Sequence, residues 1–140
     1  MGNHRFVIET EPSPRDIRFL QLSLYEYNAE QTGFHDGKRL CIFERDHSGS
    51  MVAGLYGWTW AGCLRVSDLW VRDNERRRGY GSEILEAAEH EARGRNCKRA
   101  ILYTHSFQAP AFYQKRGYRI VSTLEDFPPG HRTYTLIKDL

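Results

Sequence analysis

Residues 66–85 read VSDLWVRDNERRRGYGSEIL, and this stretch decides the fold because its hydrophobic period changes partway along. It begins with apolar, β-branched and aromatic residues of strand character and passes through a charged segment at residues 73–77. It then continues with a helical period whose apolar face carries Ile84, Leu85, Ala88 and Ala92. The stretch therefore predicts a strand, a polar turn and an amphipathic helix in immediate succession.

Two glycines, Gly79 and Gly81, stand at the junction of the predicted strand and helix, directly after three arginines. Glycine lets the backbone approach a ligand closely, and the first N–H groups of a helix have no partner within the helix. Together with the positive end of the helix dipole, these groups form a site for an anion. The third glycine of a dinucleotide fingerprint and the Gly-Lys-Ser of a P-loop are both missing. We therefore expect a phosphate-bearing cofactor here, and a helix start without a ligand is the alternative.

A second motif follows the predicted buried strand at residues 99–104, where residues 106–118 read SFQAPAFYQKRGY. Together with Arg-x-x-Gly-x-Gly at residues 76–81, this resembles the GNAT superfamily of N-acetyltransferases. In that family a short helix carries Ala, then Phe-Tyr, then Lys-x-Gly-Tyr or Lys-x-Gly-Phe. The matching positions here are Ala109, Phe112, Tyr113, Lys115, Gly117 and Tyr118. The resemblance covers residues 66–118, but the family usually has Asn where Ser106 stands and often Glu where Ser67 stands.

The resemblance implies acetyl-CoA as cofactor and a single acetyltransferase domain over residues 1–140. The loop and helix start would hold the pyrophosphate, and backbone groups at the strand end would hold the pantetheine. A further contact would come from the position of the family's Asn. The implied cofactor-binding residues are Leu69, Trp70, Val71, Arg76, Arg77, Arg78, Gly79, Tyr80, Gly81, Ser82 and Ser106.

Acetyl transfer to an amine requires a neutral amine and a proton for the leaving thiolate. Tyr113 matches the position that donates this proton in many relatives, and a phenol with a pKa of about 10 is protonated at neutral pH. The base is open between two candidates. Asp68, on the predicted strand, either deprotonates the amine or binds its charge. His105 follows a strand end, and histidine is the residue type that commonly serves as a general base. We therefore expect Tyr113 and Asp68 to be catalytic and no metal to be bound.

The rest of the chain predicts further strands and helices around this unit. Residues 51–60 and 63–71 meet at Ala61-Gly62 and predict an antiparallel hairpin, in which Gly54 and Gly57 weaken the first strand or mark a bulge. Other strands are expected at residues 5–9, 39–45, 118–123 and 133–137, helices at 13–27 and 108–116, and a loop or broken helix at 28–38. The fold class is α/β, with a mixed, largely antiparallel central sheet flanked by helices. We expect the last strand at the edge of the sheet, where it would support a homodimer.

Composition excludes several other classes of protein. The net charge of +2 argues against a nucleic-acid partner. Three widely spaced cysteines without a C-x-x-C pair predict neither a disulfide framework nor a zinc site. No apolar stretch approaches the about 20 residues of a membrane span, and no signal-peptide core follows residues 1–5. We therefore expect a cytoplasmic protein without a membrane partner.

The predicted function is acetyl-CoA-dependent N-acetyl transfer to a primary amine, with a small molecule as the preferred class of acceptor. A protein amino-group acetyltransferase and an acyl-CoA-binding regulatory module without catalysis are the alternatives. The intact Tyr113 favours the enzyme, whereas the departures at Ser67 and Ser106 favour the module.

Overall fold

The computed structural model describes residues 5–140, and the contacts divide the chain into two compact units, Met1–His35 and Asp36–Leu140. The first unit carries the helix α1 (Pro14–Thr32), and the hydroxyl of Ser13 caps it by accepting the N–H of Asp16 at 3.1 Å. The predicted start of this helix is therefore confirmed. Residues 1–4, on which the expectation about a leader partly rests, lie outside the described residues.

Two predictions for the first unit are wrong. The helix continues to Thr32, so the loop expected from residue 28 begins only at Gly33, whose φ of 78° ends the helix. The reason is that residues 28–32 contain no helix breaker. Residues 5–9 form no strand, because none of the strands in the described part of the chain pairs with them.

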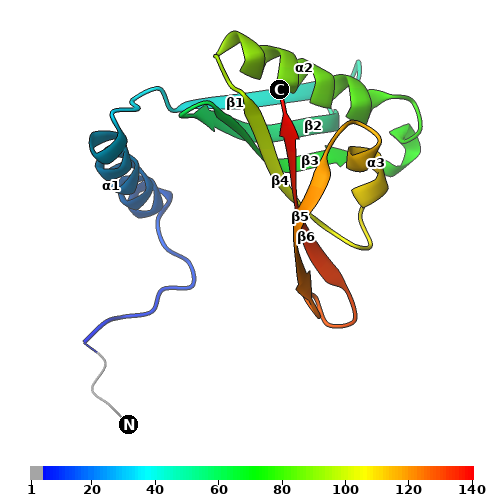
Figure 1. Ribbon diagram of the computed structural model, residues 1–140. Coiled ribbons are helices and arrows are strands. Elements are labelled where there is room, and N and C mark those ends of the chain that lie inside the picture. The colour runs from blue at the N-terminus through cyan, green and yellow to red at the C-terminus, as the bar shows by residue number, and fades with distance from the viewer. Residues whose placement is uncertain (1–4) are drawn as a thin grey trace. The chain divides into compact units, whose positions relative to one another are not determined.

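The second unit is built on a six-stranded sheet in the order β1-β2-β3-β4-β6-β5 (Figure 1). Its strands are β1 (Lys38–Arg45), β2 (Met51–Trp60), β3 (Cys63–Val71), β4 (Arg99–His105), β5 (Arg119–Glu125) and β6 (Arg132–Asp139). Neighbouring strands are antiparallel except for β3 and β4, which are parallel. The predicted fold class is therefore confirmed.

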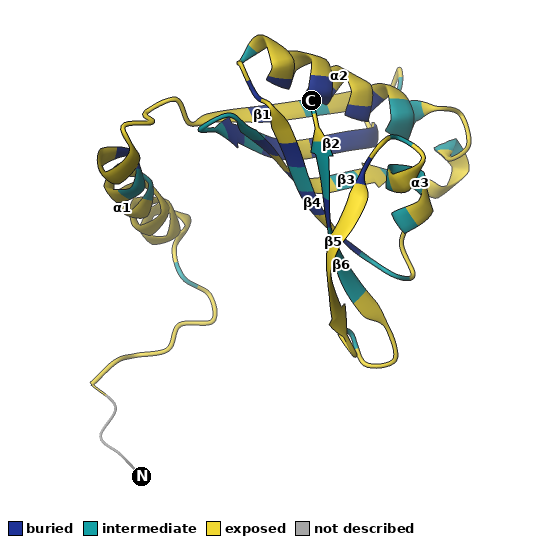
Figure 2. Cartoon of the chain, in the orientation of Figure 1, coloured by how far each residue is buried: buried dark blue, intermediate teal, exposed yellow. Residues whose placement is uncertain are grey.

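The helix α2 (Tyr80–Gly94) packs against β1, β2 and β3 and covers one face of the sheet. Its predicted apolar face is buried, and Figure 2 shows buried positions where the helix and the sheet meet. Ile84, Leu85, Ala88 and Ala92 lie in one cluster with Leu55, Leu64, Leu102 and Leu136 of the sheet. Each fully buried leucine contributes about 1.5–3 kcal/mol, so this cluster fixes the position of α2 on the sheet.

A β-bulge interrupts the hairpin of β2 and β3. Gly57 pairs with Val66, but the preceding residue of β2, Tyr56, pairs with Asp68, so Ser67 is the extra residue. A side chain at Gly57 would collide with the carbonyl oxygen of Arg65, which explains the glycine. Beyond the bulge Leu69 and Val71 pack on the core, and Asp68 and Trp70 project from the opposite face, called the outer face below.

The prediction that the last strand lies at the edge is wrong. β6 lies between β4 and β5, and its Leu136 is fully buried, whereas every residue of β5 is exposed. β6 rather than β5 therefore takes the inner position and buries side chains against the sheet. The expectation of a homodimer through an unpaired β6 edge loses its basis. No helix in the described residues is long and apolar enough to cross a membrane.

Candidate active site

β3 and β4 separate along part of their length. They pair only from Cys63 with Arg99 to Val66 with Leu102, although β3 continues to Val71 and β4 to His105. Residues 67–71 of β3 and 103–105 of β4 therefore border a gap between the two strands, called the β3–β4 gap below. Such a gap exposes backbone donors and acceptors that need other partners.

The backbone of β3 directs two of its residues toward this gap. The N–H of Arg72 donates to the carbonyl of Val52 on the β2 side at 2.8 Å. Backbone N–H and C=O groups of successive residues point to alternate sides of a strand. Those of Leu69 and Val71 therefore point toward the β3–β4 gap, and those of Trp70 point toward β2. The Nε of Arg76 donates a hydrogen bond to the carbonyl of Val71 at 3.0 Å, which ties the loop before α2 to the end of β3.

The start of α2 has no side-chain cap. Gly79 precedes the helix with a φ of 86°, and its carbonyl accepts the first helical N–H, that of Glu83, at 3.0 Å. The N–H groups of Tyr80, Gly81 and Ser82 therefore have no acceptor within the helix and point out of its N-terminus. This part of the molecule can bind an anion.

A cavity of about 840 Å³ joins the helix start, the β3–β4 gap and the short helix α3 (Pro110–Gln114). Ten of the predicted site residues line it: Leu69, Trp70, Val71, Arg76, Arg77, Gly79, Tyr80, Gly81, Ser82 and Tyr113. Its volume lies within the range of about 300–1,000 Å³ that is usual for ligand sites. The structure thus brings together most of the residues that the two sequence motifs selected.

Three predicted site residues do not line the cavity. Arg78 forms an ion pair with Glu75 at 3.0 Å, and the hydroxyl of Ser106 accepts the N–H of Arg132 at 3.0 Å. Asp68 lies on the outer face of the sheet, where its carboxylate is exposed and has no hydrogen-bond or ion-pair partner within residues 5–140.

Sequence reasoning missed Arg116, which links the two motifs. Its Nε donates to the hydroxyl of Ser82 at 3.1 Å, its Nη1 donates to the carbonyl of Phe112 at 2.8 Å, and its guanidinium lies 3.8 Å from the centre of the Phe112 ring. These contacts hold α3 against the start of α2. The available signal was its place between Lys115 and Gly117 of the second motif. Glu75, Phe107, Gln108, Ala109 and Phe112 also line the cavity.

Tyr113 contributes a phenol to the lining of this cavity. Its half-buried ring makes edge contacts with Phe112 at 5.0 Å and with Tyr118 at 5.8 Å between ring centres. Burial raises the pKa of Tyr113 to about 12, so the phenol stays protonated at neutral pH. No residue within 5–140 accepts a hydrogen bond from its hydroxyl, which leaves the proton available to a ligand.

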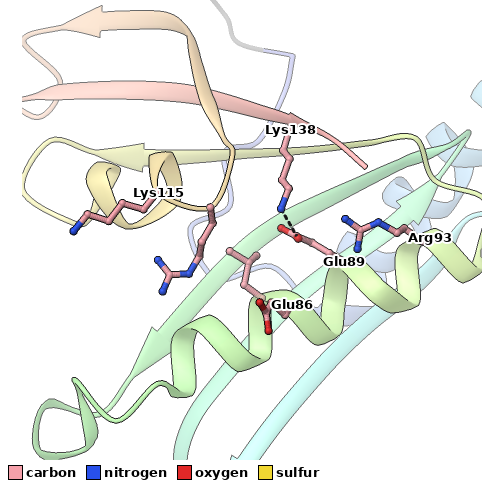
Figure 3. Close-up of a pocket in the computed structure, with 7 residues that line it drawn as sticks. Glu86, Glu89, Arg93, Lys115 and Lys138 are labelled. Atoms are coloured by element: carbon pink, nitrogen blue, oxygen red, sulfur yellow. Dashed lines mark hydrogen bonds and ion pairs between the residues drawn. The ribbon is translucent and has the colours of Figure 1, made fainter.

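A buried carboxylate supports Tyr118 behind this site. The hydroxyl of Tyr118 donates to Oε2 of Glu89 at 2.8 Å. Lys138 Nζ donates to Oε1 of Glu89 at 2.7 Å, as Figure 3 shows. Glu89 and Lys138 also border a second cavity of about 500 Å³. Burial and the bond to Glu89 raise the pKa of Tyr118, so this phenol also remains neutral. Within the described residues no cluster of His, Cys, Asp or Glu could hold a metal ion.

Comparison with known proteins agrees with this geometry. The profile of the Acetyltransferase (GNAT) family matches residues 5–118. Blasticidin-S acetyltransferase of Streptomyces morookaense is 40% identical over 96 residues, which are 66% of this chain and 68% of that protein. An acetyltransferase of Agrobacterium fabrum is 33% identical over 125 residues, covering 89% of this chain and 91% of its own.

A solved structure extends the similarity to the whole fold. The crystal structure of an acetyltransferase from Bacillus cereus superposes with a TM-score of 0.78 at 28% identity, covering 96% of this chain and 98% of the other. The family profile spans most of the chain, and the relatives are named acetyltransferases. The chain therefore belongs to the GNAT family of acetyltransferases.

Proposed function

We propose that the protein transfers the acetyl group of acetyl-CoA to a primary amine of a small molecule. The observation that carries this proposal is the single cavity that joins three features: the uncapped start of α2, the backbone at the β3–β4 gap, and the phenol of Tyr113. An anion site, an amide-binding strand end and an acid are three of the parts that the reaction needs.

The residues of the cavity fit acetyl-CoA, which supplies an acetyl group on a thioester when it is bound. The N–H groups of Tyr80, Gly81 and Ser82 would hold the pyrophosphate. Arg77 lines the cavity and has no carboxylate partner within residues 5–140, so its charge is available to phosphate. The backbone groups of Leu69 and Val71 would hold the pantetheine amides.

The other arginines and Ser106 contribute by shaping the site. Arg76 bonds to the Val71 carbonyl and forms an ion pair with Asp73 at 2.7 Å, and Arg78 forms its ion pair with Glu75. We infer that both arginines hold the loop before α2. The Ser106 hydroxyl accepts the N–H of Arg132 and so holds the start of β6. We infer that Ser106 has a structural role, whereas the family's Asn at this position would contact the cofactor.

Tyr113 gives its proton to the leaving thiolate in this proposal. This half-buried residue lines the cavity, and its neutral phenol has no hydrogen-bond acceptor in the described chain. The carboxylate of Asp68, exposed on the outer face, would bind the positive charge of the acceptor amine. An acid placed in the cavity favours an enzyme over a regulatory acyl-CoA-binding module.

The class of acceptor is supported by the relatives. One of the most similar proteins is named for acetylation of blasticidin S, a small molecule. We therefore propose a small-molecule amine as the acceptor, with a protein amino group as the alternative. Blasticidin S is the first compound to test.

A calorimetric and thermal-shift experiment tests the binding step. Acetyl-CoA at 100 times its dissociation constant should stabilise the folded protein by about 2.7 kcal/mol. Gly81→Val should abolish this, because a Cβ at Gly81 already lies 3.4 Å from Phe112 Cζ and 3.7 Å from Val71 Cγ2, so a branched side chain would distort the cavity. Gly94→Ala, at the other end of α2 with open space around it, is the matched control and should bind normally.

A thiol-release assay tests the transfer step. Acetyl-CoA is mixed with blasticidin S, a panel of other small amines, and peptides with free amino groups. Turnover with a small amine is the expected result. Turnover with peptides alone would favour the protein acetyltransferase, and binding without any turnover would favour the regulatory module.

A further inference from the structure

His105 lies at the end of β4, beside the β3–β4 gap. Ala100, Leu102 and Thr104 of β4 are buried, so the alternating position of His105 places its side chain on the outer face. Asp68 lies on the same face of β3, after the bulge. The two side chains therefore stand on the two strands that border the gap.

Two aromatic rings hold the imidazole of His105. Phe107 stacks on it with 5.2 Å between ring centres and an angle of 14°, and Phe127 meets it edge-on at 5.9 Å. Phe107 also lines the large cavity, so the imidazole packs against the wall of that cavity. Gln108, another lining residue, accepts the backbone N–H of His105 at 2.7 Å.

A chain of hydrogen bonds selects the tautomer of this imidazole. The hydroxyl of Thr133 donates its only proton to the carbonyl of Phe127 at 2.7 Å. Its oxygen, 2.8 Å from Nδ1 of His105, must therefore accept, which requires a proton on Nδ1. In the neutral ring Nε2 then carries the lone pair, and no residue within 5–140 bonds to it.

We propose that His105 is the general base of the acetyl transfer and that Thr133 is its positioning residue; this inference rests on the proposed function. Nε2 takes one proton from the acceptor ammonium, whose charge Asp68 binds. The resulting amine forms the N–C bond to the acetyl carbon, the C–S bond breaks with its electron pair on sulfur, and the sulfur takes the proton of Tyr113. The new amide nitrogen returns its surplus proton to the Tyr113 oxygen, and His105 releases its own proton to water.

Steady-state kinetics on variants of the full chain test the base. The acceptor is the panel amine with the highest turnover, starting from blasticidin S. His105→Asn retains an N–H donor for Thr133 but has no base, so kcat should fall roughly 10²-fold while acetyl-CoA binding stays unchanged. His105→Ala should fall similarly and recover in part with added imidazole. His47→Asn, in the exposed β1–β2 turn, is the control and should behave as wild type.

The role of Thr133 is tested by measuring the tautomer of His105, which a purely packing role of Thr133 would not change. Nitrogen NMR of the labelled protein should show the neutral His105 ring protonated on Nδ1. Thr133→Val, which lacks the hydroxyl, should lose the preference for a proton on Nδ1 and lower kcat. Thr133→Ser, which keeps the hydroxyl, should keep both the tautomer and kcat close to wild type.

Each outcome separates the two proposals. If wild type turns over an amine but His105→Asn keeps full kcat, or if the neutral ring carries its proton on Nε2, the assignment of His105 is overturned and the proposed function stands. If wild type acetylates no amine in the panel, the proposed function itself fails.

Discussion

The buried carboxylate of Glu89 makes Lys138 the most informative position for stability. The side chain of Glu89 is 4% exposed and that of Lys138 is 20% exposed, and 2.7 Å separates Nζ from Oε1. Lys138→Met keeps the aliphatic stem but leaves a buried carboxylate with only the Tyr118 hydroxyl as partner. Removing one partner of a buried ion pair costs about 3–5 kcal/mol.

Two features of the structure reduce this cost. Tyr118 still donates to Oε2, and the partly exposed position of Lys138 lets water replace some of the lost interaction. We therefore expect Lys138→Met to lower the free energy of unfolding by about 2–3 kcal/mol. Tyr118→Phe, which removes one hydrogen bond to a charged group, should lower it by about 1.5–3 kcal/mol.

Urea unfolding followed by circular dichroism measures both changes. The double variant Lys138→Met with Glu89→Gln removes the charge itself, so it should recover much of the loss, because a neutral amide oxygen can still accept from Tyr118. Lys115→Met lines the same cavity without an ion pair and should change stability by less than about 0.5 kcal/mol. A Lys138→Met protein as stable as wild type, or a double variant no better than the single one, would refute the reasoning.

Three further predictions concern the phenol, the bulge and a surface turn. Tyr113→Phe should lower kcat roughly 10²-fold with unchanged CoA affinity. Because the pKa of Tyr113 is about 12, the loss of wild-type activity through ionisation of the phenol should appear only as the pH rises toward that value. Gly57→Ala should lower the free energy of unfolding by about 1–3 kcal/mol in denaturant titration, since its Cβ meets the Arg65 carbonyl and forces β2 and β3 apart. Hydrogen bonds from Ser48 and Arg72 lower the pKa of Asp46 from 3.8 to about 2. The ionised carboxylate therefore stabilises the fold fully above pH 3.8, and this contribution is lost as the pH falls through about 2. Asp46→Asn should lower the melting temperature at pH 7 and remove this acid-dependent loss of stability.

Much of the central unit could be predicted from local sequence. The change of period in residues 66–85 predicted β3 and α2, and Ala61-Gly62 predicted the hairpin, because strand alternation, helix faces and tight turns depend on neighbouring residues. The family resemblance that the two motifs carry also selected most of the residues that line the cavity. The spacing of residues within each motif is set locally, by the backbone conformation and the close packing that the motif requires.

The remaining features depend on contacts between distant residues. The order of β5 and β6 follows from which strand buries its side chains against the rest of the sheet, and both strands have similar local patterns. Arg116 acquires its role only through Ser82, 34 residues away in sequence. The tautomer of His105 likewise depends on Thr133, 28 residues further along, and no spacing rule connects them.

Acetyl transfer itself is the most direct test of the account. The purified protein is incubated with acetyl-CoA labelled in the acetyl group and with blasticidin S and the amine panel, and the products are analysed by mass spectrometry and NMR. The account predicts that the labelled acetyl group appears on an amine nitrogen of a small molecule, with release of CoA, and that Tyr113→Phe greatly slows its appearance. Bound acetyl-CoA that never gives up its label to any amine would contradict the account.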